Sequence, residues 1–80
     1  MAKRVARSSV NRLSTVEKKA LILKAAEKVF AQQGLKGSRL FEIANEADLP
    51  KANLLYYFQS KEDIYRAVCR DILETWLEAL

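Results

Sequence analysis

Three backbone breakers divide this chain, because its only glycines are Gly34 and Gly37 and its only proline is Pro50. A β-sheet needs many turns, and turns are rich in Gly and Pro. The small number of Gly and Pro residues among these 80 residues therefore favours helices. Half of the residues are apolar, and between the breakers they recur at helical spacing. We therefore predict an all-α fold. A chain of this length forms one small domain with a single modest core.

Two helices are predicted before residue 48. The first begins near Thr15, because Ser14 and Glu17 have the spacing of a capping box, and Gly34 ends it by supplying a left-handed conformation. Its apolar face contains Ile22, Ala25, Ala26, Val29 and Phe30. After the break at Gly37, Ser38 is the expected cap of a second helix of about nine residues. The buried stripe of that helix contains Leu40, Ile43, Ala44 and Ala47.

Two further helices are predicted after the turn at Asp48. The third starts at about Pro50, whose missing N–H costs nothing in a first turn, and it turns Leu54 and Phe58 toward the core. Ser60 and Asp63 have the spacing of a second capping box, which opens the fourth helix. The core face of this last helix contains Ile64, Val68 and Ile72.

The fourth helix ends with large apolar side chains, which are Trp76, Leu77 and Leu80. A domain of this size has too little apolar surface to cover them. We therefore expect the chain to be the front portion of a longer protein. A native protein with the 9.1 kDa mass of these residues would contradict that expectation.

The net charge of +4 lies in the first residues of the chain. Four basic side chains and no acidic one precede residue 13, and they are Lys3, Arg4, Arg7 and Arg12. This segment lacks apolar periodicity, so we predict that residues 1–13 form a flexible basic arm. Such arms contact phosphates or enter a minor groove, and Lys3, Arg4 and Arg7 are the expected contacts. A merely solvated tail is an equal alternative on this evidence.

Several functional classes are disfavoured by what the sequence lacks. It has no histidine and no cysteine pair, and it has no Gly-rich phosphate loop, so we expect no metal site, no cofactor and no enzymatic activity. Cys69 is interpreted as a small buried hydrophobic residue. No apolar run is long enough for a secretory signal or a membrane span. We expect a cytoplasmic protein that does not bind membranes.

The second and third predicted helices, with the short turn between them, have the spacing of a helix-turn-helix. In that motif the later helix lies in the major groove of DNA. Lys51 and Asn53 can donate hydrogen bonds to base edges. Leu55 and Tyr56 can pack against thymine methyl groups, and tyrosine hydroxyls can reach phosphates. The four candidate base-contacting residues are therefore Lys51, Asn53, Leu55 and Tyr56.

Candidate phosphate contacts lie on both sides of the third helix. Lys61 occupies the first turn of the fourth helix, where the helix dipole disfavours its charge and a bound anion would relieve this. Ser38 and Arg39 offer a similar arrangement at the start of the second helix. Tyr57 is the remaining candidate, although a half-buried place in the core is its alternative interpretation. For Lys61 and Arg39 the alternative is an ordinary solvated side chain.

The segments just described also carry a family resemblance. Its residues are Ile22 to Phe30, Gly34, Gly37 and Ser38, Ile43 and Ala44, Ala47, Lys51, Asn53 and Leu54, Tyr56, Phe58, and Ser60 to Glu62. Through them, residues 15–70 closely resemble the DNA-binding domain of TetR-family bacterial transcriptional regulators. The resemblance implies a homeodomain-like helix-turn-helix domain over residues 14–60. It also implies that residues 61–80 begin a helix leading to a further C-terminal domain.

Four positions depart from the pattern of that family. Its signature has Leu-Tyr-Tyr-His-Phe before Ser-Lys-Glu, whereas here Leu55 replaces the first tyrosine and Tyr57 replaces the histidine. Asp48 stands where a turn glycine is usual, and it adopts the left-handed conformation only at some cost. Pro50 replaces a common serine cap. The run from Asn53 to Phe58 looks particularly like the branch that includes regulators of pyrimidine degradation.

The resemblance implies a homodimeric repressor that binds a double-stranded DNA operator. A larger C-terminal domain would bind a small-molecule inducer, change the spacing of the two recognition helices and lower operator affinity. Dimerisation and inducer binding are therefore expected to be weak or absent in these 80 residues. A second hypothesis stays open, a small helical protein-interaction module anchored by Tyr56, Tyr57 and Trp76. The two hypotheses differ in how strongly retention on a DNA column depends on salt.

Overall fold

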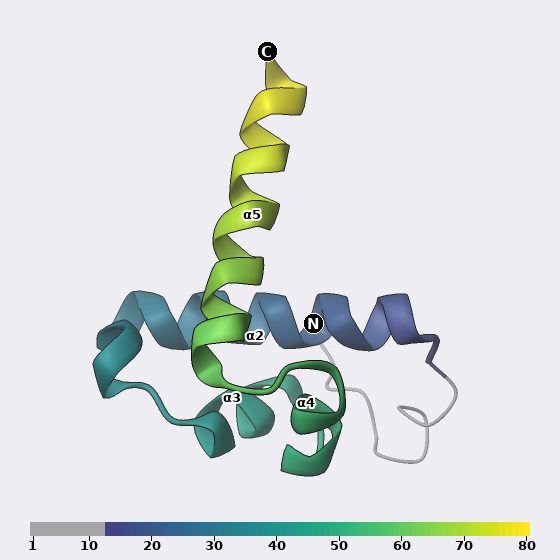
Figure 1. The fold of residues 1–80 in the computed structure, drawn as a ribbon, viewed down its shortest axis with the longest axis vertical. Helices are drawn as coiled ribbons and strands as arrows, with labels where there is room; N and C mark the ends of the chain where they lie inside the picture. The colour runs from purple at the N-terminus through teal and green to yellow at the C-terminus, as the bar shows by residue number, and fades with distance from the viewer. Residues whose placement is uncertain (1–12) are drawn as a thin grey trace, which may run out of the picture.

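The computed structural model describes residues 13–80 and has four helices there, with no strand in that range (Figure 1). They are α2 (Thr15–Gly37), α3 (Leu40–Ala47), α4 (Lys51–Tyr57) and α5 (Lys61–Ala79). The prediction of an all-α fold is confirmed. The basic arm, including Lys3, Arg4 and Arg7, lies outside the described residues apart from Leu13.

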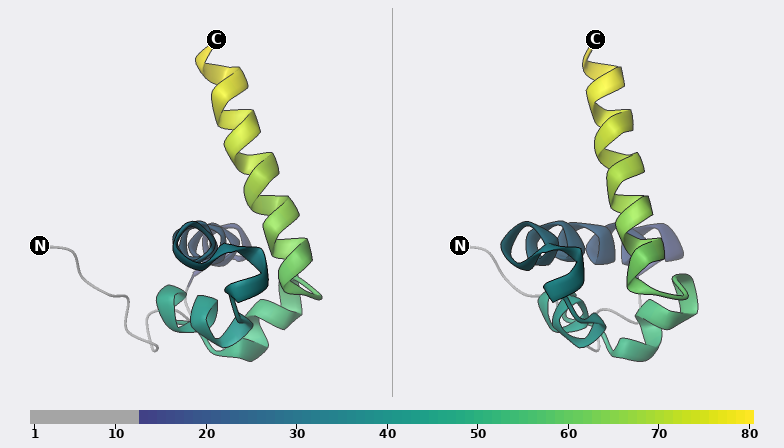
Figure 2. Two further views of the ribbon diagram at one scale, coloured as in Figure 1. Left: turned by 90° about the vertical axis from the view of Figure 1, so that its left-hand side faces the viewer. Right: turned by 60° about the vertical axis from the view of Figure 1, so that its left-hand side comes forward.

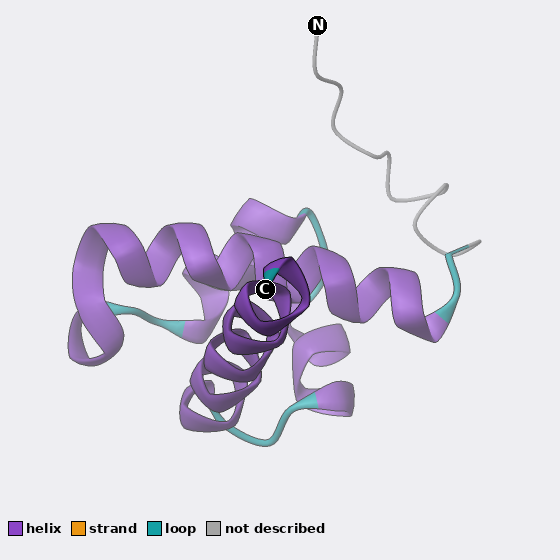
Figure 3. Cartoon of the chain, turned by 90° about the horizontal axis from the view of Figure 1, so that it is seen from above, coloured by secondary structure: helices purple, strands orange, loops and turns teal. Residues whose placement is uncertain are grey.

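The short helices α3 and α4 lie on one side of the long helix α2 (Figure 1). Helix α5 starts on that same side, crosses α2 and extends away from the other three helices. Figure 2 shows this from two further directions, and Figure 3 shows α5 rising toward the viewer. The C-terminal part of α5 therefore projects from the rest of the described chain.

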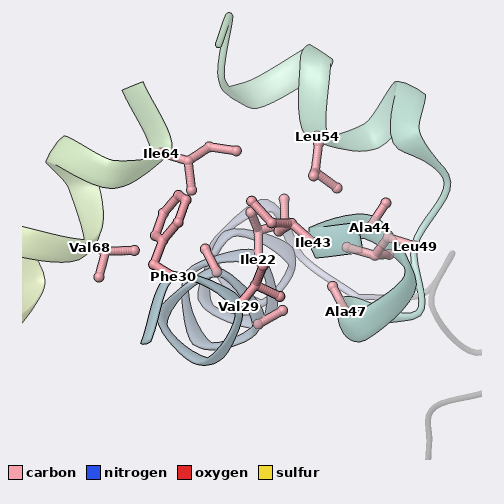
Figure 4. Packing of buried hydrophobic residues seen from close by; sticks show 12 residues of the cluster. Ile22, Val29, Phe30, Ile43, Ala44, Ala47, Leu49, Leu54, Ile64 and Val68 are labelled. Carbon is pink, nitrogen blue, oxygen red and sulfur yellow. The ribbon is translucent and has the colours of Figure 1, made fainter. Parts of the chain in front are cut away.

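The core lies where the four helices meet, and every helix contributes to it (Figure 4). Its twelve buried apolar residues are Ile22, Ala25, Ala26, Val29, Phe30, Ile43, Ala44, Ala47, Leu49, Leu54, Ile64 and Val68. Phe58 packs against this cluster, as predicted, and Tyr65 adds an edge-on contact with the ring of Phe30 at a centroid distance of 5.3 Å. The predicted faces of α2, α3 and α4 are therefore largely correct.

Two of the three predicted capping residues, Ser14 and Ser60, are the N-caps of α2 and α5. The Glu17 backbone N–H donates to the Ser14 hydroxyl at 3.1 Å, and the Ser14 N–H donates to the Glu17 carboxylate at 2.9 Å. The hydrogen bond that the Ser14 backbone N–H donates to the Glu17 carboxylate, followed by the Ser14 side chain, lowers the pKa of Glu17, so this stabilising effect is lost as the pH falls through that lowered pKa. At α5 the Asp63 N–H donates to the Ser60 hydroxyl at 3.2 Å.

Three local predictions are wrong. The residue that caps α3 is Arg39 and not Ser38, and the Arg39 backbone N–H donates to Glu42 at 2.9 Å. Cys69 is exposed, and Ile72 is also exposed, because α5 has left the core after Val68. Helical periodicity correctly predicts that Ile64 and Val68 face the core. It does not predict where along α5 the contacts with the other helices end.

Gly34 interrupts α2 without fully ending it. Its φ of 75° and ψ of 169° lie in a region that is essentially restricted to glycine, and one more helical turn follows to Gly37. A Cβ atom added at Gly34 would meet no atom within 4 Å, so the constraint is set by the backbone. Gly37 has no such φ, and its added Cβ would meet only the Gln33 Cβ at an ordinary 3.6 Å.

Replacing each glycine by alanine separates these two situations. We expect Gly34→Ala to lower the free energy of unfolding by about 1–3 kcal/mol, because alanine must adopt a glycine-only conformation. Gly37→Ala should be neutral or stabilising by about 0.5 kcal/mol, because it reduces the entropy of the unfolded chain. Urea unfolding followed by circular dichroism measures both. Equal effects of the two substitutions would contradict the role assigned to Gly34.

Candidate nucleic-acid interface

The turn between α3 and α4 is closed by backbone hydrogen bonds. Asp48 adopts the left-handed conformation (φ 60°, ψ 41°), and its N–H donates to the Asn45 carbonyl at 3.2 Å. The next N–H, from Leu49, donates to the Ala44 carbonyl at 3.0 Å while the Leu49 side chain is buried. This is the pattern of a Schellman motif with its apolar contact. Asp48 thus takes the conformation for which a glycine is usual, and the turn geometry is kept.

Helix α4 is a seven-residue helix with one fully buried side chain, Leu54. Pro50 precedes it in an extended conformation and acts as the N-cap, so the helix begins one residue later than predicted. With Leu54 turned inward, Lys51, Ala52, Leu55 and Tyr56 are exposed. The structure brings the four predicted base-contacting residues together on this one short helix. We call them the base-contact face, which consists of Lys51, Asn53, Leu55 and Tyr56.

The members of the base-contact face differ in accessibility. Lys51 is exposed, Leu55 is 45% exposed and Tyr56 is 82% exposed, which is high for an aromatic ring. Asn53 is half-buried, and its backbone N–H donates to the Pro50 carbonyl at 2.9 Å. A cation, an amide, an aliphatic group and a phenol are thereby presented from one helix. Such a mixture can donate hydrogen bonds and pack against methyl groups.

Tyr57 lies at the edge between the core and the surface. It is half-buried and packs against the core, as its alternative interpretation expected, and its ring meets the Tyr56 ring edge-on at a centroid distance of 5.0 Å. The Lys19 ammonium lies 5.8 Å from the centre of the Tyr57 ring. Sequence reasoning missed Lys19. The sequence feature that could have identified Lys19 is its spacing, because it precedes the buried Ile22 by three residues and so lies on the same side of α2.

Lys61 joins the start of α5 to the segment between α2 and α3. Its ammonium donates to the Ser38 carbonyl at 2.9 Å and to the Lys36 carbonyl at 3.3 Å. An ammonium has three N–H groups, so one remains for a further acceptor. Lys61 therefore has a structural role that the sequence did not reveal. Its position still leaves a positive charge at the start of α5.

Ser38 and Arg39 are neighbours in sequence but differ in accessibility. Ser38 is only 1% exposed, and its hydroxyl donates to the Gly34 carbonyl at 2.5 Å, so this hydroxyl completes the end of α2. A phosphate contact by that hydroxyl would require the segment to open, so Ser38 is not among the phosphate contacts that we propose. The Arg39 side chain is exposed beside the start of α3. It remains a candidate phosphate contact.

Neither a metal site nor a membrane-spanning helix is found in the part of the chain that the structure describes. Residues 13–80 contain no group of three or more His, Cys, Asp or Glu side chains placed to hold a metal ion. No helix in that range combines the length and apolar character needed to cross a membrane. The functional groups that this surface offers to a ligand include the exposed Lys51 ammonium and the exposed Arg39 guanidinium.

Comparison with known proteins places the chain in a family. Residues 22–68, which are more than half of the chain, match the family described as bacterial regulatory proteins, tetR family. The HTH-type transcriptional regulator RutR of Escherichia coli K12 is 54% identical over 63 residues, covering 79% of this chain and 30% of RutR. The HTH-type transcriptional repressor NicS of Pseudomonas putida is 38% identical, covering 72% of this chain and 27% of NicS.

A solved structure agrees with these sequence relatives. The crystal structure of a mutant HlyIIR protein has a TM-score of 0.68 and 41% sequence identity, covering 70% of this chain and 32% of that protein. The chain thus spans about a third of the length of the relatives it matches. Matched residues 22–68 run from the core face of α2 through the base-contact face to α5. The chain belongs to the TetR family of bacterial regulatory proteins.

Proposed function

We propose that this chain is the operator-binding part of a transcriptional regulator, with α4 lying in the major groove. The observation that carries the proposal is the base-contact face on a helix whose rotation is fixed by the buried side chain of Leu54. A recognition helix needs both properties, because its exposed side chains select bases only when the helix itself is held in place. Lys51 and Asn53 donate to base edges, and Leu55 and Tyr56 pack against thymine methyl groups.

Phosphate contacts complement the base-contact face in this proposal. Arg39 at the start of α3 and Lys61 at the start of α5 supply positive charge near each other, because the Lys61 ammonium donates to the carbonyl of Ser38, the residue before Arg39. The Tyr57 hydroxyl supplies a neutral contact, and the basic arm adds Lys3, Arg4 and Arg7. Such contacts fix the position of a protein on DNA and make its affinity depend strongly on salt.

The properties of the longer protein follow from family membership and are part of the same proposal. We infer a cytoplasmic homodimer in which a C-terminal domain outside this chain binds a small-molecule inducer. Two copies of α4 then contact two half-sites of one operator, and inducer binding lowers operator affinity. The protein acts as a repressor in this scheme. The exposure of Trp76 (70%), Leu77 (58%) and Leu80 (99%) is consistent with a further domain that covers them.

Selection of bound duplexes from random DNA by the full-length protein tests the proposed function directly. The expected result is a pair of half-sites, and their spacing reports the distance between the two recognition helices. Binding should weaken linearly on a plot of log affinity against log salt. If no sequence is enriched and retention on DNA is independent of salt, the protein-interaction alternative is the better description.

Asn53→Ala tests the base contact. We expect it to weaken binding to the selected operator by about 1–3 kcal/mol and to relax specificity at one base position, because a paired amide donor and acceptor are removed. Competition between operators that differ at single positions measures both effects. Equal loss of affinity on operator and on random DNA would assign Asn53 to the backbone instead.

Lys61→Met tests the two roles of Lys61, since methionine keeps the aliphatic stem and removes the ammonium. Loss of the hydrogen bonds to the Ser38 and Lys36 carbonyls should lower the free energy of unfolding by about 1 kcal/mol. Loss of a phosphate contact should reduce the salt slope of DNA binding by about one unit. Urea unfolding and salt titrations measure the two effects separately.

Lys24→Met is the matched control, because Lys24 is an exposed lysine of α2 and its removal changes the net charge equally. An unchanged salt slope in Lys61→Met with a clear loss of stability would leave Lys61 as a purely structural residue.

A further inference from the structure

The core-facing side of α2 contains a lysine before its apolar residues begin. Ile22, Ala26 and Val29 are buried along this side, and Lys19 precedes Ile22 by three residues and Ala26 by seven. These spacings place Lys19 on the same face of the helix, at its N-terminal end. Lysine can cover apolar surface with its stem while its ammonium stays in water. Here the ammonium lies 5.8 Å from the centre of the Tyr57 ring in α4.

Tyr57 transmits this contact to the base-contact face. Its half-buried ring is held on one side by the core and meets the Tyr56 ring edge-on, with an interplanar angle of 86°. Tyr56 has few other constraints, because 82% of its surface is exposed. Lys19, Tyr57 and Tyr56 therefore form a continuous series of contacts from α2 to the exposed Tyr56 ring of α4. Edge-on aromatic pairs and cations over rings are both favourable arrangements.

We propose that Lys19 is a positioning residue for operator recognition, acting through the Tyr57 ring to orient Tyr56 on the base-contact face. This inference rests on the proposed function, since it requires α4 to contact bases. Lys19 contributes by ordering two rings before DNA arrives, which lowers the entropy lost on binding. It is therefore distinct from Arg39 and Lys61, whose proposed contribution is charge beside the phosphates.

Lys19→Met removes the ammonium and keeps the stem. It should weaken binding to the selected operator roughly two- to fivefold, the effect of one exposed cation–ring contact, and leave the salt slope equal to that of the control Lys24→Met. Lys19→Arg should retain wild-type affinity, because a guanidinium also stacks on a tyrosine ring. In a Tyr57→Leu background, Lys19→Met should cost no more than Lys24→Met, since the ring through which it acts is gone.

NMR spectra of the DNA-free protein give an independent measurement. The ring proton shifts of Tyr57 and Tyr56 should change in Lys19→Met and stay unchanged in Lys24→Met. Circular dichroism confirms that each variant retains its helices.

Three results would overturn the inference. They are unchanged Tyr56 ring shifts, an affinity loss equal to that of Lys24→Met, and a salt slope lowered by about one unit, which would make Lys19 a direct phosphate contact. Failure of the wild-type protein to select any operator would instead refute the proposed function itself.

Discussion

Burial of Leu49 and Leu54 is the interaction on which the geometry of the candidate interface depends. Leu49 fixes the end of the α3–α4 turn, and Leu54 fixes the rotation of α4 about its own axis. A seven-residue helix has too few hydrogen bonds to be stable in isolation, so its existence depends on this packing. The side chains presented to solvent are consequently determined by what is buried beneath them.

The sequence predicted those parts of the fold that depend on neighbouring residues. Capping by Ser14 and Ser60 and the break at Gly34 are decided within one helical turn, and each was located within a residue or two. Errors arose where the outcome depends on distant segments. Ile72 follows the apolar period of α5, but its burial requires a partner surface that the other helices do not extend far enough to provide. Cys69 is exposed because one residue turns it about 100° around the helix from the buried Val68.

The candidate site divides in the same way. Exposure of Tyr56 follows from helical geometry once Leu54 is assigned to the core, because two residues turn its side chain about 200° around the helix from Leu54. The carbonyl contacts of Lys61 could not be predicted, because they join positions far apart in the sequence. The same is true of the Ser38 hydroxyl, whose burial depends on how α2 ends, and of Lys19, whose ring contact exists only after α2 and α4 have packed together.

The projecting part of α5 has a consequence for helix cooperativity. Residues 69–80 include no buried side chain, although the helix continues through them as far as Ala79. A helix of that length alone would have to overcome the cost of its first turn, whereas here Ile64 and Val68 hold the preceding turns against the core. The core thus nucleates the projecting turns, which only need to propagate. Their order should decrease steadily toward Ala79, the reverse of what independent nucleation near Trp76 would produce.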